Sequence, residues 1–348
     1  MNKQTGISVY VGLTDYSITD TLKYLEKAVD LGIDFVFTSA HIPEADIEGD
    51  FQVLLDKCDE LNLPIVVDVS KKIMDKFTLP KSLGALRLDY GFTKEEVAEY
   101  SNTLPYMIEL NASNMTRTYL NTLKSLNANF NNIRVSYNFY PKRYTGMDLE
   151  NVKKLNELYH EFGLTVFGYV PSNSGKRPPL YDGLPSVESH RDLDLLLSTQ
   201  ELFAAGCDGV CVGDAYISED DFNKLSTVKN EFIIPIKVYP NLTKEELEIL
   251  EYPHHFRIDE GSYMKRSSKT RGTKIEPHNT KNIEPFMVTI DNILYKRYTG
   301  EVSIALRKME NKGFVNVVGK VISDAETLVE LIKPGSKFKF KIEGYINE

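Results

Sequence analysis

Several features that mark familiar protein classes are missing from this chain. Three cysteines in 348 residues are too few, and odd in number, to build a disulfide framework. The formal net charge of −9 lacks the basic excess of a nucleic-acid-binding protein. No apolar run reaches the roughly 18 residues of a membrane helix, and residues 1–5 show no signal-peptide core. We therefore expect a cytoplasmic protein with neither nucleic-acid nor membrane partners.

The common catalytic and metal-binding motifs are absent as well. The six histidines are scattered apart from His254 and His255, without a His-x-x-x-His pair or a carboxylate ladder. No Gly-x-Ser-x-Gly elbow and no P-loop are present. These absences exclude the usual serine hydrolases and nucleotidases, and they predict that neither a metal nor a cofactor is used. A metal-free hydrolase with paired carboxylates remains.

What the sequence does contain is a repeated unit of strand, loop and amphipathic helix between residues 6 and 215. Eight strands are predicted, at residues 6–12, 34–39, 64–70, 85–91, 107–112, 133–139, 164–171 and 209–214. Alternation of strands and helices indicates parallel strands, and eight units indicate a closed (β/α)8 TIM barrel. An open doubly wound sheet would need a glycine-rich fingerprint after an early strand, which residues 12–15 do not supply.

A ninth strand-like run at residues 233–239 is an alternative eighth strand. After residue 252 helices become rare, and a small β-rich domain is predicted. Its expected strands are residues 256–258, 286–290, 301–306, 315–321 and 337–342, with one helix at 325–332. We therefore predict a barrel domain at residues 1–250 and a β domain at 251–348. The basic run 265–274 is either a mobile loop or a segment that folds over the barrel mouth.

Period-two alternation predicts which polar side chains point into the barrel. In the strands at 85–91 and 107–112, the outward-facing leucines turn Arg87 and Glu109 inward. Arg134, on the next strand, faces the same way. Because a lone buried charge is prohibitively costly, this layer is expected to be a buried ion-pair cluster.

A second polar layer lies one step nearer the carboxyl ends of the strands, where the reactive groups of such barrels collect. It contains Asp89, Asn111 and Asn138, and it is where we expect catalysis. Asp68 and Asp214 end their own strands at comparable positions and are weaker candidates.

The loop at residues 138–146 is dense in side chains that suit a ligand with both a ring face and an anion. It follows a strand, and Asp148 beyond it is expected to cap the next helix. Lys142 and Arg143 supply charge and Tyr140 and Tyr144 supply rings. The alternative is an ordinary solvated loop. We expect replacement of Arg143 with alanine to weaken mainly the binding of phosphorylated sugars.

Two further loops carry candidate residues. The long, proline-rich segment 172–191 brings Arg177, His190 and Arg191 to the part of a barrel that often holds phosphate, and Glu188 belongs to the same candidate set. The loop at 38–44 adds His41, a titratable group with several ordinary roles, and Glu44. Glu44 either caps the next helix or protonates a leaving oxygen.

Five segments together resemble the bacterial 6-phospho-N-acetylmuramidases. They are residues 38–44, 86–92, 108–113, 138–146 and 183–191. The resemblance runs the full length and implies a TIM barrel with a cyclophilin-like C-terminal domain. It also implies a cytoplasmic glycoside hydrolase of peptidoglycan recycling, which splits N-acetylmuramic acid 6-phosphate from β-linked N-acetylglucosamine. Lys142, Arg143, Arg177 and Arg191 would then meet the anions of this disaccharide, and the two tyrosines would stack on its rings.

The predicted reaction is glycoside hydrolysis by two carboxylates, with Asp89 and Glu44 as the first pair and Glu109 and Asp214 in reserve. Expected substrate contacts are His41, Asn111, Asn138, Tyr140, Arg143, Tyr144, Arg177, Glu188, His190 and Arg191. A sugar-phosphate isomerase or aldolase and a non-catalytic carbohydrate-binding barrel are the alternatives. The sequence does not determine the oligomeric state, and a homodimer is one of the states it allows.

Overall fold

The structure, a computed structural model, describes residues 3–13, 15–40, 49–76 and 78–346. The chain divides into two compact units, residues 1–229 and 230–348. This division falls before residue 250, the boundary expected from the sequence. The reason is that strand β9 (Phe232–Val238) and helix α8 (Lys244–Glu251) belong to the second unit.

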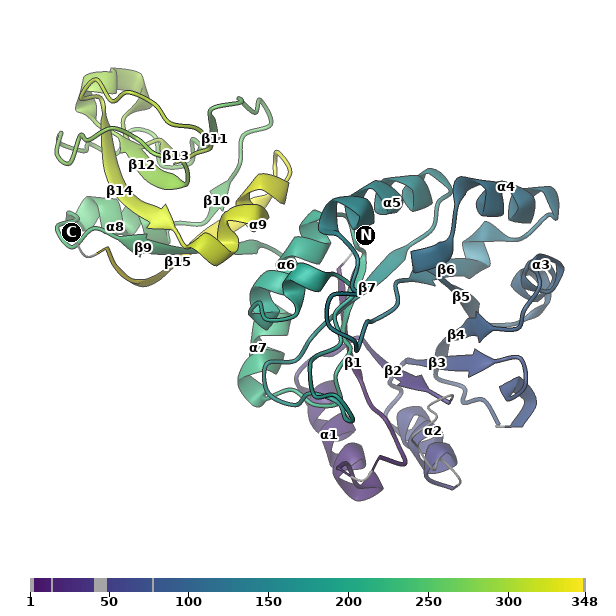
Figure 1. The fold of residues 1–348 in the computed structure, drawn as a ribbon. Helices are drawn as coiled ribbons and strands as arrows, with labels where there is room; N and C mark the ends of the chain where they lie inside the picture. Colours follow the sequence, from purple (N-terminus) through teal and green to yellow (C-terminus); the bar gives the residue numbers. More distant parts are fainter. Residues whose placement is uncertain (1–2, 14, 41–48, 77, 347–348) are drawn as a thin grey trace. The chain divides into compact units, whose positions relative to one another are not determined.

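The first unit is a closed parallel barrel, as predicted (Figure 1). Its strands are β1 (Gln4–Ser8), β2 (Phe35–Ser39), β3 (Ile65–Ser70), β4 (Leu83–Tyr90), β5 (Met107–Asn111), β6 (Ile133–Ser136), β7 (Val166–Val170) and β8 (Gly209–Val212). Strand β8 pairs with β1 and closes the ring. The eighth strand is therefore the one predicted at 209–214 and not the run at 233–239.

Helices cover the outside of the barrel (Figure 1). They are α1 (Ile18–Asp30), α2 (Asp50–Glu60), α3 (Lys94–Thr103), α4 (Arg117–Ser125), α5 (Leu149–Glu161), α6 (Leu195–Ala204) and α7 (Glu219–Thr227). Between β3 and β4 the structure has the short 3-10 helix η1 (Met74–Lys76). Asp148 caps α5 as predicted, since its side chain accepts hydrogen bonds from the backbone of Glu150 and Asn151.

Large apolar side chains fill the interior of the barrel. Phe35, Phe37, Phe167 and Tyr169 belong to one buried cluster, and the Phe37 and Tyr169 rings meet edge to face at 5.3 Å. This packed layer closes the interior, so the barrel is not a pore. The charged side chain of Arg134 packs against this layer, 4.4 Å from the centre of the Phe167 ring.

The second unit is built on a sheet with strand order β10-β15-β9-β14-β12-β13-β11. Its remaining strands are β10 (His254–His255), β11 (Met264–Ser267), β12 (Met287–Asp291), β13 (Val302–Ala305), β14 (Val315–Val321) and β15 (Lys337–Tyr345), with helix α9 (Glu326–Leu331). All pairs are antiparallel except β9 with β15. Most predicted strands are confirmed, but the strand expected at 256–258 is instead the two-residue β10 just before it.

The basic run 265–274 is not simply a loop. Its first residues form most of β11, where Lys265 is buried and pairs with Glu260 at 2.5 Å. Arg271 pairs with the buried carboxylate of Glu301. Lys265 and Arg271 are therefore paired with carboxylates of the second unit. Separately, no helix in the described part of the chain is both long enough and apolar enough to span a bilayer.

Candidate active site

Four charged residues of alternating sign form a row inside the barrel. Strands β3 to β6 place Asp68, Arg87, Glu109 and Arg134 at matching register positions, and all four are buried. Arg87 donates to Asp68 at 2.8 Å, and Arg134 donates to Glu109 at 2.7 Å. The predicted ion-pair cluster of Arg87, Glu109 and Arg134 is therefore confirmed, and Asp68 extends it.

Glu109 is too enclosed to act on a ligand. Its side chain is 2% exposed, and its oxygens accept from Arg134 at 2.7 Å and from Ser136 at 2.5 Å. The Arg134 guanidinium lies over the Phe167 ring, 4.4 Å from its centre. A buried charge persists only with such partners. We therefore assign Glu109 to the support of the barrel, in place of its predicted reserve role in catalysis.

Arg87 organises the upper part of the row. Its Nη1 donates to Asp68 at 2.8 Å and to Asp89 at 3.3 Å, and its Nη2 donates to the Oδ1 of Asn138 at 2.7 Å. Asp68 also accepts from the Ser39 hydroxyl at 3.0 Å. One guanidinium thus fixes two carboxylates and one amide at the barrel mouth.

The two carboxylates differ in environment. Burial raises the pKa of Asp68 and outweighs the opposing effect of Arg87, whereas the Asp89 side chain is 34% exposed. Because both Oδ1 atoms contact the same Nη1 at 2.8 and 3.3 Å, they lie no more than about 6 Å apart, below the roughly 6.5 to 9.5 Å of inverting glycosidases. A separation in this range is compatible with the roughly 5 to 5.5 Å between the two carboxyl groups of retaining glycosidases.

Two asparagines bring amide groups to the same mouth. The Asn111 Oδ1 accepts from the backbone of Ser113 at 2.9 Å, which leaves its Nδ2 as a donor. The Ser113 hydroxyl accepts from the backbone of Asn138 at 2.9 Å. Asn111 and Asn138 are both half-buried. The predicted layer of Asp89, Asn111 and Asn138 therefore exists at the carboxyl ends of β4, β5 and β6.

Asp214 organises the loop after β7 and is itself almost fully buried. Burial raises its pKa, while backbone N–H groups of Arg177, Ser172 and Leu184 lower it by donating to its oxygens. These contacts measure 2.9, 2.9 and 3.2 Å. A carboxylate with three such donors holds backbone in place, so we move Asp214 from the predicted catalytic reserve to a positioning role.

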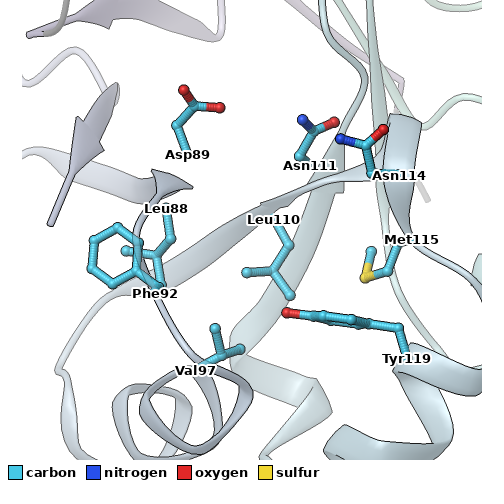
Figure 2. Close-up of a pocket in the computed structure, with 9 residues that line it drawn as sticks. All are labelled: Leu88, Asp89, Phe92, Val97, Leu110, Asn111, Asn114, Met115 and Tyr119. Atoms are coloured by element: carbon cyan, nitrogen blue, oxygen red, sulfur yellow. The ribbon is translucent and has the colours of Figure 1, made fainter.

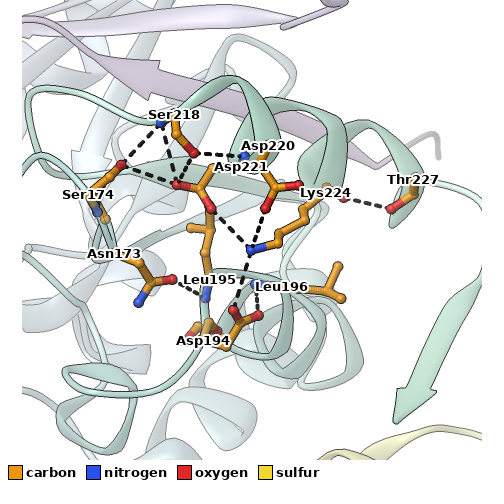
Figure 3. A network of polar contacts seen from close by, with 12 residues as sticks. Asn173, Ser174, Asp194, Leu195, Leu196, Ser218, Asp220, Asp221, Lys224 and Thr227 are labelled. Atoms are coloured by element: carbon orange, nitrogen blue, oxygen red, sulfur yellow. Dashed lines mark hydrogen bonds and ion pairs between the residues drawn. The ribbon is translucent and has the colours of Figure 1, made fainter. Parts of the chain in front are cut away.

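The same loop is attached to α6 and α7 by a polar network (Figure 3). Lys224 lies among Asp194, Asp220 and Asp221, at 3.7, 3.0 and 3.4 Å. Ser174 donates to Asp221 at 3.2 Å and so ties the loop to the beginning of α7. These contacts fix the segment that carries Arg177.

Arg191 and Glu188 join this loop to the loop at residues 138–146. Arg191 is buried, binds Glu188 at 2.7 and 2.8 Å, and donates to the carbonyl of Tyr140 at 2.9 Å. Glu188 accepts from the backbone of Tyr144 at 2.8 Å and of Gly146 at 2.7 Å. A side chain at Gly146 would collide with Glu188, which explains the glycine. Both charged groups hold loops together, in contrast to the substrate contacts predicted for them.

His190 and Arg143 are likewise occupied. His190 is fully buried and pairs with the buried Glu201 at 3.0 Å. Arg143 binds Asp182 at 2.5 Å and Asp192 at 2.6 Å. We therefore withdraw both from the residues expected to meet the substrate.

The Glu188 contacts predict an acid-dependent stability. Arg191 holds the pKa of Glu188 at about 2, below its ordinary 4.5, so the stabilisation is complete above that ordinary value and is lost as pH falls towards 2. Glu188→Gln should therefore lower the free energy of unfolding most at neutral pH, and the deficit should shrink between about pH 4.5 and 2. Urea unfolding across this range measures it. Glu161→Gln, in an exposed pair with Arg117, is the control. A deficit that does not change with pH would contradict the assignment.

Arg177 is a cation of the loop after β7 that forms no ion pair with a described residue. It is half-buried, and its guanidinium lies 4.7 Å from the Tyr10 ring centre and 5.4 Å from that of Phe139. No carboxylate of a described residue forms an ion pair with it. Tyr140 is half-buried and Tyr144 is 85% exposed, so both present ring surface. The role of Arg177 as an anion partner stays a prediction, and unlike Arg143 and Arg191 it has no carboxylate partner among the described residues.

A pocket of about 170 Å³ opens beside Asp89 (Figure 2). Its polar edge consists of Asp89, Asn111 and Asn114. The rest of its lining is Leu88, Phe92, Val97, Leu110, Met115 and Tyr119. The sequence does not predict this pocket, because the alternation of residues places Leu88 and Leu110 on the face that packs against helices.

Two predicted residues, His41 and Glu44, lie outside the described residues. Among the residues that the structure does describe, no group of three or more His, Cys, Asp or Glu side chains could hold a metal ion. Asp68, a weaker candidate from the sequence, contacts the same arginine nitrogen as Asp89. The alternation of residues 65–70 places it on the inward face, but its contact with Arg87 depends on how β3 and β4 align.

Comparison with known proteins identifies the family. Residues 5–227 match the N-terminal model of the 6-phospho-N-acetylmuramidases, and residues 232–341 match the C-terminal model. A search of curated proteins found no match. Neither family match favours an isomerase, an aldolase or a non-catalytic barrel.

Two solved structures are similar along their whole length. An uncharacterized protein of B. cereus is 25% identical, with a TM-score of 0.85 over 98% of this chain and 100% of that one. A conserved protein of Enterococcus faecalis with an unknown function is 30% identical, with a TM-score of 0.71 over 98% and 96%. The two family matches together span nearly the whole sequence. The chain belongs to the 6-phospho-N-acetylmuramidase family and is a glycoside hydrolase that acts on a phosphorylated amino sugar.

Proposed function

We propose that the protein hydrolyses the β-linked disaccharide of N-acetylmuramic acid 6-phosphate and N-acetylglucosamine, with Asp68 and Asp89 as the catalytic carboxylates. The observation that carries this proposal is Arg87, which holds an oxygen of each carboxylate on one nitrogen. Glycosidases need two carboxylates on either side of the scissile bond, one protonated and one ionised. Glu44, the other predicted partner, is outside the described residues.

The two environments suggest the roles. Burial raises the pKa of Asp68, which favours the protonated form that a general acid needs. Asp68 gives its proton to the leaving oxygen, while the more exposed Asp89 attacks the anomeric carbon. Water then releases the sugar, activated by Asp68 as a base. This sequence of two displacements retains the configuration at the anomeric carbon.

Proton NMR of the first-formed sugar phosphate tests the proposal directly. Incubation with the phosphorylated disaccharide should release N-acetylglucosamine and the β-anomer of N-acetylmuramic acid 6-phosphate. If the α-anomer appeared first, the Asp68 and Asp89 pair would be wrong, and a carboxylate farther from Asp89 would be required. No release of N-acetylglucosamine would contradict the activity itself.

Arg177 is proposed to bind the phosphate. Its cation lies between two rings without an acidic partner among the described residues, so an anionic ligand completes its contacts. Arg177→Gln should raise KM for the phosphorylated disaccharide about 10- to 100-fold, since a hydrogen bond to a charged group contributes about 1.5 to 3 kcal/mol. The unphosphorylated disaccharide should be affected much less.

Steady-state kinetics with both disaccharides makes the comparison. Arg143→Gln is the matched control, because Arg143 is already paired with Asp182 and Asp192 and should change both substrates alike. A loss in Arg177→Gln that is equal for both substrates would remove Arg177 from the phosphate site.

We further propose that the reaction takes place in the cytoplasm, during peptidoglycan recycling. The three cysteines support this compartment, because all are buried and unpaired. A cyclophilin-like second domain and a homodimer remain predictions from the sequence.

A further inference from the structure

The pocket beside Asp89 combines features that few groups of a sugar phosphate can match. Leu110, Val97 and Met115 are buried and apolar, and Asp89 and Asn111 lie at the edge (Figure 2). A group that enters must therefore have a hydrocarbon end and a polar base with both a donor and an acceptor.

We propose that this pocket receives the acyl group of the acetamido substituent next to the scissile bond, with the acyl methyl between Leu110, Val97 and Met115. The proposal rests on the function proposed above and extends it to substrate selection. An acetamido N–H needs an acceptor, which the second oxygen of Asp89 supplies. Its carbonyl needs a donor, which the Nδ2 of Asn111 supplies, since the Oδ1 of Asn111 is already bonded to Ser113.

The place of the pocket agrees with this assignment. The acetamido group is attached to C2, which is bonded directly to the anomeric carbon. A carboxylate that acts at the anomeric carbon is therefore within reach of the C2 substituent as well. Asp89 both lines the pocket and belongs to the proposed catalytic pair, so it satisfies both requirements.

The other substituents of the sugar fit less well. The lactyl carboxylate and the phosphate are anions, and the Asp89 carboxylate at the entrance repels them. Apolar walls would also leave their oxygens without partners. An uncharged acyl chain carries neither penalty.

The size of the pocket makes a sharper prediction. A cavity of about 150 Å³ can hold benzene, so a pocket of about 170 Å³ has room for an acyl chain longer than acetyl. The wild-type enzyme should therefore accept the N-propionyl disaccharide about as well as the N-acetyl one. The free amine, which lacks both the methyl and the carbonyl, should lose at least about 10- to 200-fold in kcat/KM.

Two substitutions fill the pocket from different segments. Val97→Phe acts from α3 and Met115→Phe from the turn before α4. Each should reduce kcat/KM for the N-propionyl substrate about 10-fold more than for the N-acetyl substrate. Val53→Phe on α2 is the matched control, because Val53 is 44% exposed and does not line the pocket.

A binding series separates this inference from the proposed function. Calorimetry with muramic acid 6-phosphate carrying an acetyl group, a propionyl group or a free amine needs no turnover. Binding of both acylated sugars but not of the amine, with the propionyl form lost first in Val97→Phe, supports the pocket even if no disaccharide is cleaved. Two results would contradict the assignment of the pocket to the acyl group and leave the hydrolase assignment standing. One is cleavage of all three disaccharides with equal kcat/KM. The other is an unchanged substrate preference in Val97→Phe and Met115→Phe.

Discussion

Asp89→Asn should lower kcat for the phosphorylated disaccharide by at least about 10³-fold, the range expected when a group that acts directly in catalysis is lost. The amide keeps the size of the carboxylate but cannot carry negative charge. It therefore cannot attack the anomeric carbon. Steady-state assays of released N-acetylglucosamine measure the effect.

The same variant should remain folded. Asp89 is the most exposed of the groups that Arg87 holds, with a contact of 3.3 Å compared with 2.8 Å to Asp68. Thermal unfolding close to that of the wild type would show that the loss is chemical. Asp56→Asn, an exposed carboxylate on α2, is the matched control and should keep full activity. Near-wild-type turnover in Asp89→Asn would exclude Asp89 from catalysis.

Arg87→Met should lower the free energy of unfolding by about 3 to 5 kcal/mol near neutral pH, the usual cost of removing one partner from a buried ion pair. Asp68 would keep its burial but lose its cation. Its pKa, already raised, would rise further, because Arg87 lowers it more than the hydrogen bond from Ser39 does. The deficit should therefore shrink as pH falls and Asp68 takes up a proton.

Urea unfolding at several pH values provides the measurement. Arg117→Met is the matched control, because Arg117 and Glu161 are each 56% exposed and their pair should contribute less than about 1 kcal/mol. Activity should also fall, since Asp68, Asp89 and Asn138 would lose their common anchor. If Arg87→Met were as stable as Arg117→Met, the row of charges would not hold the barrel mouth together.

The pattern of apolar and polar residues alone was enough to predict the barrel and to predict which residues face its interior. Strands such as β4 and β5 alternate so regularly that Arg87, Asp89, Glu109 and Asn111 could only point inward. Strand β9 was harder to place. Its apolar sequence fits a strand in either sheet, and its pairing with β14 and β15 depends on residues far along the chain.

The loop residues show the opposite outcome. Arg143, Arg191 and Glu188 have the chemistry of anion or sugar contacts, and sequence cannot tell a ligand from an internal partner. In the fold, Arg143 forms ion pairs with Asp182 and Asp192, and Arg191 forms an ion pair with Glu188. Arg177 differs only because the fold brings no carboxylate of a described residue against it.

The sequence by itself determined the strand and helix order, the inward acids and the family, because these follow from local periodicity and from short contiguous segments. The tertiary structure alone decided which charged side chains form ion pairs with each other. It also decided that Asp68 and Asp89 share Arg87 and that an apolar pocket opens beside Asp89. The physical reason is that ion pairs and cavities form between residues on different strands and loops, whose separation in space is set only when the barrel closes.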